Sequence, residues 1–168
     1  AAGDTLTNPA YADTVRRIAA EGADAFYTGP IASDIVASVR TAAGNPGVLS
    51  RTDLALYDVV EGPAVCAEYR ARDVCGMGPP SSGALTVGQI LGMLDSYDLA
   101  ALGPDSPDAW RLIGDASRLA FADRGLYMAD SDYVPMPTQG LVDPEYLALR
   151  AELLGGDDAL PEVAPGEP

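Results

Sequence analysis

The chain has 168 residues, of which 48% are hydrophobic and 21% are charged, a composition typical of a globular protein with a buried core. Its formal net charge is −15, with 25 acidic residues against 10 basic ones, all arginine, and this balance argues against a nucleic-acid or anionic-membrane partner. Histidine is absent, which excludes a Ser-His-Asp or Cys-His nucleophile built from this chain alone and leaves only two cysteines as typical zinc ligands.

Membrane and cofactor partners are not expected either. No apolar run approaches the roughly 18–20 residues that a bilayer-spanning helix needs. The N-terminal residues also lack the basic-then-apolar pattern of a signal peptide. We therefore expect no membrane span, no metal and no cofactor.

The first 60 residues predict three helices. The first lies in "NPAYADTVRRIAAEG", where Asn8 can cap and a proline occupies the first turn. The second is expected from Pro30 to Ala43, and the third in "SRTDLALYDVV" with Thr52 as a candidate cap. The intervening "AFYTGPIA" has one glycine and a proline without an N–H, so it favours a helix boundary over a phosphate-binding loop.

A β-hairpin is predicted for Ala64–Met77, "AVCAEYRARDVCGM", because branched and aromatic residues alternate with polar ones around a central "YRAR". Two registers are open. A two-residue loop at Arg70–Ala71 would place Cys66 directly opposite Cys75. That register would allow a cross-strand disulfide.

The alternative register has a three-residue loop. The two-residue loop sets Glu68 against Asp73, a like-charge pair, and puts Ala71 in a turn that requires positive φ. A longer loop would instead pair Glu68 with Arg72 and move the cysteines out of register. These costs favour the longer loop and two half-buried free thiols, with the disulfide as the alternative.

Three further helices are predicted after the hairpin, at about Ala84–Ser96, Pro107–Met128 and Asp143–Leu154. The tally of six helices and one hairpin, without internal repeats, predicts a mainly helical α+β class. A lone hairpin beside six helices is unusual for a self-contained domain. We therefore expect this chain to be one layer of an assembly whose sheet lies elsewhere.

The last 14 residues, "GGDDALPEVAPGEP", are acidic, rich in proline and glycine, and free of aromatic residues. This composition predicts a solvated tail or linker. The chain is accordingly divided into a main segment, residues 1–154, and a tail, residues 155–168.

Ser81 and Ser82 in "GMGPPSSGAL" are the first candidates for chemistry. The esterase elbow requires G-x-S-x-G on a strand-to-helix turn, whereas the spacing here is "GPPSSG", and the chain has no histidine base. Two prolines stiffen the corner, and a serine before an apolar-periodic run is a usual helix cap. A corner and cap is therefore favoured, and Ser81 and Ser82 are kept as substrate-pocket candidates.

The acidic run "ADRGLYMADSDY" contains Asp123, Asp130 and Asp132. It lacks the glycine and the terminal glutamate of an EF-hand calcium loop. The run therefore favours a capping and salt-bridging loop over a metal site, with Asp123 and Arg124 pairing with neighbours on or near the long helix.

Four stretches, in order, resemble the γ-glutamyltranspeptidase family in the later part of its large subunit. They are "NPAYADTVRRIAAEGADAFYTGPIASDIVASVR", "TDLALYDV", "YRARDVCGMGPPSSGALTVGQIL" and "DASRLAFADRGLYMADSDYV". Together they cover roughly residues 5–154. Two departures from the family pattern are Ala71 in place of the usual turn glycine and Ala84 in place of the second glycine after "SSG".

The resemblance implies an N-terminal-nucleophile hydrolase with an αββα assembly, which cuts itself to free a threonine at the head of its small subunit. That threonine attacks γ-glutamyl amides of glutathione-like compounds and passes the γ-glutamyl group to water, amino acids or peptides. It uses its own terminal amine as base, so no histidine is needed.

The working residues of the family lie outside this segment, since the threonine is downstream and the carboxylate-gripping arginine is upstream. We therefore assign no catalytic residue here and expect the chain alone to be inactive. The implied partners are the rest of the large subunit, the small catalytic subunit and a small γ-glutamyl substrate, and the implied location is periplasmic or secreted. The alternatives are a cephalosporin or glutaryl acylase relative and a non-catalytic helical interaction module.

Overall fold

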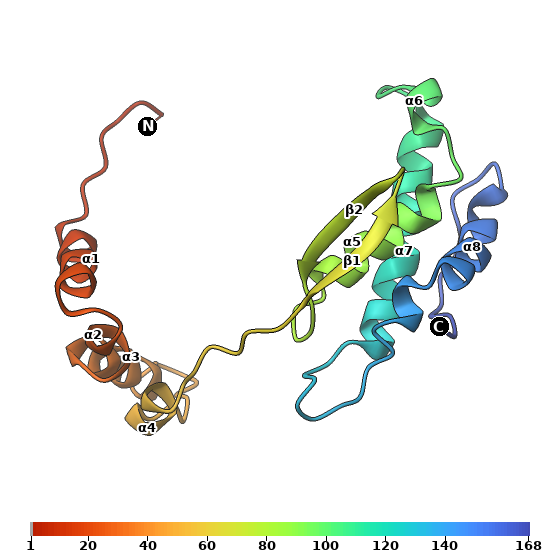
Figure 1. The fold of residues 1–168 in the computed structure, drawn as a ribbon. Helices are drawn as coiled ribbons and strands as arrows, with labels where there is room; N and C mark the ends of the chain where they lie inside the picture. Colours follow the sequence, from red (N-terminus) through yellow and green to blue (C-terminus); the bar gives the residue numbers. More distant parts are fainter. Residues whose placement is uncertain (1) are drawn as a thin grey trace. The chain divides into compact units, whose positions relative to one another are not determined.

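The computed structural model describes residues 2–168 and divides the chain into two compact units, Ala1–Val60 and Glu61–Pro168 (Figure 1). The described residues form eight α-helices, two 3-10 turns and one antiparallel hairpin. The predicted mainly helical α+β class with a single hairpin is confirmed. The two α-helices that the sequence did not predict, α2 (Asp24–Tyr27) and α6 (Leu99–Leu102), have four residues each. One turn is too short to carry a helical periodicity.

The first unit is built from short, locally capped helices. The Asn8 side chain accepts a hydrogen bond from the Tyr11 N–H at 3.0 Å, as predicted. Thr52 is not the cap of the third predicted helix, because Ser50, two residues earlier, is the N-cap and forms a reciprocal capping box with Asp53. The Ser50 hydrogen bonds lower the pKa of Asp53. The unit contains α1 (Pro9–Glu21), α2, α3 (Pro30–Arg40) and α4 (Arg51–Ala55).

This first unit has almost no core of its own. Among its described residues only Ala25 and Ala32 are buried. Large apolar side chains are exposed instead, namely Leu6, Tyr11, Val15, Val48, Leu56, Tyr57, Val59 and Val60. Two buried alanines contribute little hydrophobic free energy, so these helices require further apolar surface to pack against.

The second unit packs a hairpin and two long helices around a central helix. Helix α5 (Gly83–Leu94) contacts strand β1 on one side and helices α7 and α8 on the other (Figure 1). Met93, Leu119 and Leu154 are among the fully buried residues of this core. The remaining elements are β1 (Ala64–Tyr69), β2 (Arg72–Met77), α6, α7 (Pro107–Tyr127), η1 (Gly140–Val142), α8 (Pro144–Glu152) and η2 (Leu153–Gly155).

Glycines one turn apart on α5 allow this close packing. A Cβ on Gly88 would lie 2.8 Å from the Ala67 Cβ of strand β1, and a Cβ on Gly92 would collide with Leu147 of α8. Both neighbours sit at nearly touching distance from the helix backbone. Helix α5 can therefore approach the hairpin and α8 only because these two positions have no side chain.

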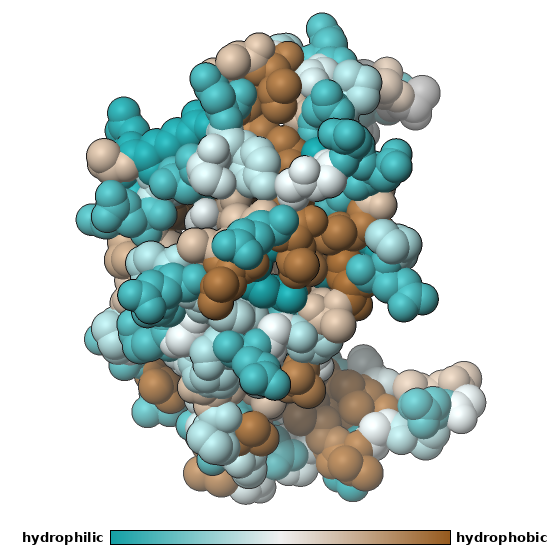
Figure 2. All heavy atoms as spheres, turned by 90° about the vertical axis from the view of Figure 1, so that its right-hand side faces the viewer, coloured by the Kyte–Doolittle hydropathy of each residue, from teal (hydrophilic) through white to brown (hydrophobic). Residues whose placement is uncertain are grey.

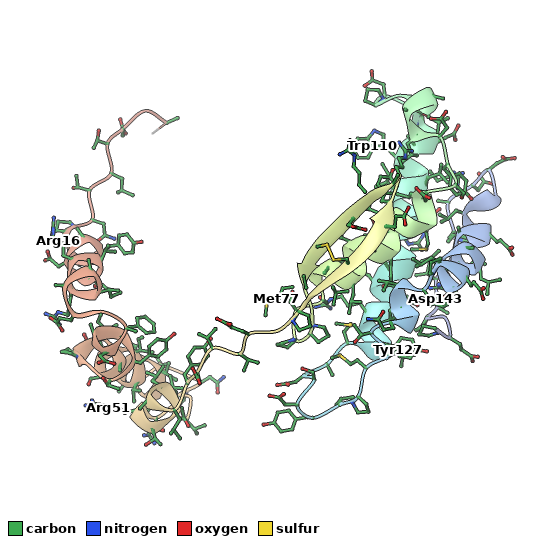
Figure 3. All side chains as sticks on the ribbon, viewed as in Figure 1. Arg16, Arg51, Met77, Trp110, Tyr127 and Asp143 are labelled. Atoms are coloured by element: carbon green, nitrogen blue, oxygen red, sulfur yellow. A yellow bond between two sulfur atoms is a disulfide. The ribbon has the colours of Figure 1, made fainter. Side chains whose placement is uncertain are left out.

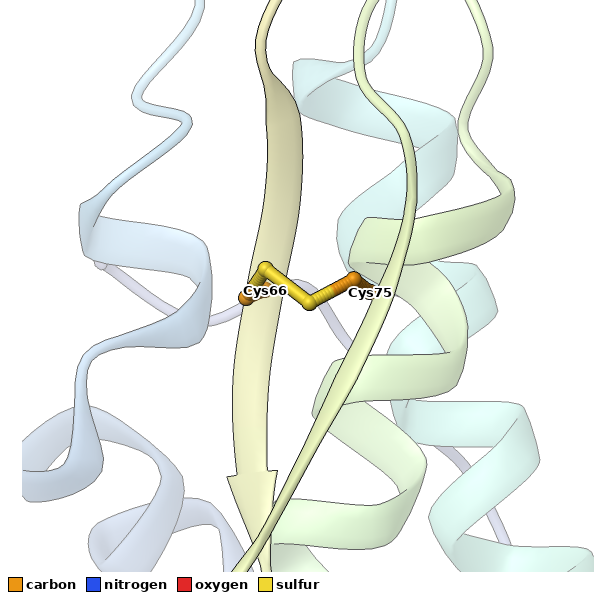
Figure 4. Close-up of a disulfide and its surroundings, with 2 residues drawn as sticks. All are labelled: Cys66 and Cys75. Atoms are coloured by element: carbon orange, nitrogen blue, oxygen red, sulfur yellow. A yellow bond between two sulfur atoms is a disulfide. The ribbon is translucent and has the colours of Figure 1, made fainter.

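The hairpin adopts the two-residue loop, so the predicted three-residue loop is wrong. Cys66 pairs with Cys75 and the two form a disulfide (Figure 4). Glu68 faces Asp73, the like-charge pair that had argued against this register. The described part of the chain contains no free cysteine.

Tertiary contacts stabilise the turn that local rules disfavour. Arg70 and Ala71 have φ of 49° and 57°, positive values that non-glycine residues seldom adopt. The Arg70 N–H donates to the Asp95 carboxylate at 3.1 Å, and the Arg70 guanidinium donates to the Tyr97 carbonyl at 3.1 Å. These bonds to the end of α5 compensate for the strain, and only the folded chain brings them together.

The acidic tail is mostly exposed, as a solvated tail would be, but it is bound to the second unit at several points. We call residues 157–168 the C-terminal strap. Within it, Leu160 and Val163 pack against the core, and the Leu160 N–H donates to the buried Asp115 carboxylate at 3.0 Å. Composition suggested a linker, but a few apolar residues and backbone amides suffice to bind it to α7. On the face of the second unit seen in Figure 2, apolar side chains form patches between hydrophilic ones.

Candidate functional site

The Ser81–Ser82 corner is held by two different hydrogen bonds. The Ser81 hydroxyl accepts from the Gly83 N–H at 3.3 Å, and the Ser82 hydroxyl accepts from Arg124 Nε on α7 at 2.9 Å. Ser82 is the N-cap residue of α5, directly before Gly83, but its side chain makes no capping hydrogen bond, contrary to expectation. Arg124 takes the hydroxyl instead and ties the corner to α7. Both serines are half-buried.

Asp123, the residue before Arg124, lies at the centre of a buried polar cluster. Its carboxylate is 0% exposed and accepts four hydrogen bonds. Oδ2 accepts from Gln89 Nε2 at 2.8 Å and from the Tyr146 hydroxyl at 2.7 Å. Oδ1 accepts from the Arg150 guanidinium at 3.0 Å and from the Gly166 N–H at 2.8 Å. Helices α5, α7 and α8 and the strap all meet at this one side chain.

The electrostatics of this cluster favour fixed positions over proton transfer. Burial, and then the hydrogen bond to Asp123, raise the pKa of Tyr146, so its hydroxyl stays a donor at any physiological pH. Arg150 also donates to the Ala164 carbonyl of the strap at 2.9 Å. With four donors on one carboxylate, the cluster can hold backbone and helices in place. Asp123 and Arg124 thus pair with neighbouring elements, as the sequence predicted.

The structure does not bring the three predicted acidic residues together. Asp123 is buried, whereas Asp130 and Asp132 lie in the exposed loop after α7, where the Asp130 carboxylate accepts from the Asp132 N–H at 3.0 Å. Within residues 2–168 no group of three His, Cys, Asp or Glu side chains is arranged to hold a metal ion. In the same residues no helix is long and apolar enough to cross a membrane.

A cleft of about 560 Å³ opens beside the hairpin. Gly92, Leu147 and Ala151 contribute its apolar lining, and Glu68 and Asp95 add carboxylates. Its lining does not include Ser81 or Ser82. Periodicity in the sequence did not predict this cleft, because it forms between β1, α5, η1 and α8, which lie far apart along the chain.

Comparison with known proteins identifies the family. The family model described as Gamma-glutamyltranspeptidase matches residues 1–167. The chain belongs to the γ-glutamyltranspeptidase family. The resemblance carried by the four sequence stretches is therefore confirmed, and the match extends into the strap.

The relatives include enzymes with two kinds of name. The chain is 36% identical over 167 residues to the glutathione hydrolase proenzyme of Escherichia coli K12, covering 98% of the chain and 28% of that protein. It is 34% identical over 157 residues to the acylase ACY 1 proenzyme of Pseudomonas sp. strain SE83, covering 94% of the chain and 28% of that protein. The chain thus spans little more than a quarter of either relative.

Solved structures show the same two groups. The Helicobacter pylori γ-glutamyltranspeptidase superposes with a TM-score of 0.83 at 32% identity, over 98% of this chain and 47% of that one. The cephalosporin acylase of Bacillus halodurans superposes with a TM-score of 0.80 at 26% identity, over 98% of this chain and 29% of that one. The arrangement of helices and hairpin is therefore that of a segment of this family.

Proposed function

We propose that the chain is part of a γ-glutamyltransferase or hydrolase that moves the γ-glutamyl group of glutathione-like compounds to water, amino acids or peptides. The observation that carries this proposal is the family match over residues 1–167 together with the identity to a glutathione hydrolase proenzyme. The nucleophile is a threonine outside this chain, which activates itself with its own terminal amine. The chain alone is inactive.

The partners are the rest of the large subunit and the small catalytic subunit. Two observations support this. The chain spans only 28% of the glutathione hydrolase relative, and its first unit exposes large apolar side chains around just two buried alanines. The missing parts supply the apolar surface that these helices require.

A cephalosporin or glutaryl acylase is the second candidate. Acylase ACY 1 is 34% identical to the chain, and the cephalosporin acylase structure superposes almost as well as the transpeptidase. Both groups share the fold of this segment, so the fold alone does not choose between a γ-glutamyl and a glutaryl or cephalosporin acyl group.

Substrate comparison tests the proposal. The full-length protein is assayed with a chromogenic γ-glutamyl anilide and, separately, with a glutaryl-cephalosporin substrate, and the 168-residue chain is assayed with both. We expect γ-glutamyl turnover by the full-length protein only. Preference for the glutaryl substrate would favour the acylase, and turnover of neither by the full-length protein would favour a non-catalytic interaction module. Product release by the 168-residue chain would contradict the location of the nucleophile.

Ser81 and Ser82 stay predictions as substrate-pocket residues. Their support is the half-buried corner that Arg124 fixes at 2.9 Å from the Ser82 hydroxyl. If either serine lines the pocket, its change to alanine in the full-length enzyme raises KM for the γ-glutamyl donor while the melting temperature stays within a degree or two of wild type. An unchanged KM in both variants leaves the serines a structural corner.

We also propose that the protein functions outside the cytoplasm, in the periplasm or as a secreted enzyme. The Cys66–Cys75 disulfide supports this location, because structural disulfides persist mainly in oxidising compartments. Fractionation of cells that produce the full-length protein tests it, and recovery in the cytoplasmic fraction with both thiols reduced would contradict it.

A further inference from the structure

The C-terminal strap is anchored at both of its ends. Near its start, the Leu160 N–H donates to the buried Asp115 carboxylate, and Arg118 donates to the carbonyls of Leu160 and Pro161. At its end, Pro168 lies against Gly140, where a Cβ would come within 3.0 Å of the Pro168 carbonyl carbon. Residues 160–168 therefore follow a fixed path over the second unit.

Gly166 is held most firmly, by both of its backbone polar groups. Its N–H donates to Asp123 Oδ1 at 2.8 Å, and its carbonyl accepts from the Tyr127 hydroxyl at 2.6 Å. Tyr127 is the last residue of α7 (Figure 3). Asp123 and Tyr127 lie four residues apart on that helix, so both face the strap. We call these two side chains the Gly166 clamp.

Only glycine fits the clamp. A Cβ on residue 166 would collide with the Tyr146 hydroxyl and would lie 3.0 Å from Tyr146 Cε2 and 3.1 Å from Arg150 Cδ. The Tyr146 hydroxyl cannot readily move aside, because it donates to the buried Asp123 carboxylate at 2.7 Å. The site around residue 166 therefore requires a residue without a side chain, in addition to the two backbone hydrogen bonds.

The Gly166 clamp fixes the direction of the strap backbone and adds little to the apolar core. The strap adds few apolar residues to a core that α5, α7 and α8 already form, yet both backbone polar groups of Gly166 bond to side chains of α7, one of them the fully buried Asp123 carboxylate. Relatives of the chain are named proenzymes, which are made as one polypeptide and then cut.

We propose that Asp123 and Tyr127 are positioning residues for self-cleavage of the proenzyme. By gripping Gly166, they fix the direction in which the following chain leaves the second unit and so deliver the cleavage point to the catalytic site. Cleavage hydrolyses one peptide bond, consumes one water, and yields a new carboxylate and a new terminal amine. This inference rests on the proposed function, in which the cleavage point lies downstream of this segment.

The size of the effect follows from chain entropy. If the clamp fails, the strap is released from its end back to the anchor at Leu160, and the released residues add to the free chain ahead of the cleavage point. For a connection about as long as this released part of the strap, the free length doubles, and the probability of closing the loop falls about threefold. Without the clamp the chain also leaves the strap in many directions, which lowers the probability of closing the loop further. We expect self-cleavage to slow by about threefold or more.

Two variants of the full-length proenzyme test the inference. Tyr127→Phe removes one hydroxyl-to-carbonyl bond without changing the ring, and Gly166→Ala places a methyl group against Tyr146. Tyr97→Phe is the matched control for the first, since the Tyr97 hydroxyl donates to the Ala151 carbonyl at 3.0 Å away from the strap. Gly155→Ala is the matched control for the second, because a Cβ there meets nothing within 4 Å.

Precursor conversion is followed on gels after pulse-labelled cell-free synthesis, and γ-glutamyl anilide turnover is measured per mole of matured enzyme. We expect slower conversion in Tyr127→Phe and Gly166→Ala than in their controls, with wild-type turnover once matured. Conversion at the rate of the controls would overturn the inference, as would a proportional fall of conversion and matured turnover, which indicates general misfolding.

The wild-type protein separates this inference from the function on which it rests. If wild type converts and turns over γ-glutamyl anilide while the two variants behave like their controls, only the clamp is wrong. If wild type neither converts nor turns over substrate, both the proposed function and the clamp are wrong.

Discussion

Replacing the buried carboxylate at position 123 is the sharpest test of what stabilises the second unit. Asp123 accepts from Gln89, Tyr146, Arg150 and Gly166, and all four partners are donors. In Asp123→Asn, one acceptor oxygen becomes an amide that faces donors, so two of the four bonds are lost. The Arg150 side chain, 9% exposed, is left as a buried cation without its counter-charge.

Breaking a buried pair from one side typically costs about 3–5 kcal/mol. We expect Asp123→Asn to lower the opening free energy of α7 by that amount. Since about 1.4 kcal/mol is a factor of ten, amide exchange of residues 107–127 should accelerate by roughly 100- to 5000-fold. Peptide-resolved hydrogen exchange of the full-length protein measures this directly.

Two further variants complete the test. Asp105→Asn changes an exposed aspartate in the loop before α7. It should change the opening free energy of α7, measured by amide exchange, by less than about 0.5 kcal/mol. Asp123→Asn combined with Arg150→Met should destabilise less than the sum of the two single changes, because the charges are coupled. A loss below about 1 kcal/mol in Asp123→Asn, or strict additivity in the double variant, would refute the reasoning.

Three other predictions follow from the second unit. The double variant Cys66→Ser, Cys75→Ser should destabilise the hairpin by about 2–3 kcal/mol through loss of the cross-link. The loss should appear as faster amide exchange of residues 64–77. A reductant should have the same effect on wild type, and an unchanged exchange rate in reductant would contradict the prediction. Because the pKa of Tyr146 is raised on folding, wild-type stability should fall as pH rises above the ordinary tyrosine pKa of about 10, whereas urea unfolding of Tyr146→Phe should lack that component. Parallel stability curves for the two proteins would contradict this. Gly88→Ala should destabilise by about 1–3 kcal/mol because its methyl would meet strand β1, whereas Gly114→Ala, with nothing within 4 Å, should stabilise by about 0.5–1 kcal/mol, and thermal melts showing equal shifts would argue against the close packing of α5.

The sequence by itself determined the helices that carry their own signals. Asn8 caps α1, Asp143 caps α8, and the predicted bounds of α5 and α7 lie within two residues of the observed ones. These features depend on residues within one or two turns of each other, so they can be read along the chain. The four ordered motifs also identified the family, because specific residue types in a fixed order along the chain can be compared directly with the family pattern.

Contacts between distant residues were decided only by the tertiary structure. The hairpin adopts its register despite a like-charge pair and a positive φ at Ala71. Hydrogen bonds from Arg70 to Asp95 and Tyr97, near the end of α5, and the disulfide between the strands stabilise it. Composition predicted a solvated tail, yet Asp123 and Asp115 bind its backbone amides from within the core. Local rules compare a residue with its neighbours in sequence, whereas the free energy of the buried Asp123 carboxylate depends on four donors from three separate segments, α5, α8 and the strap.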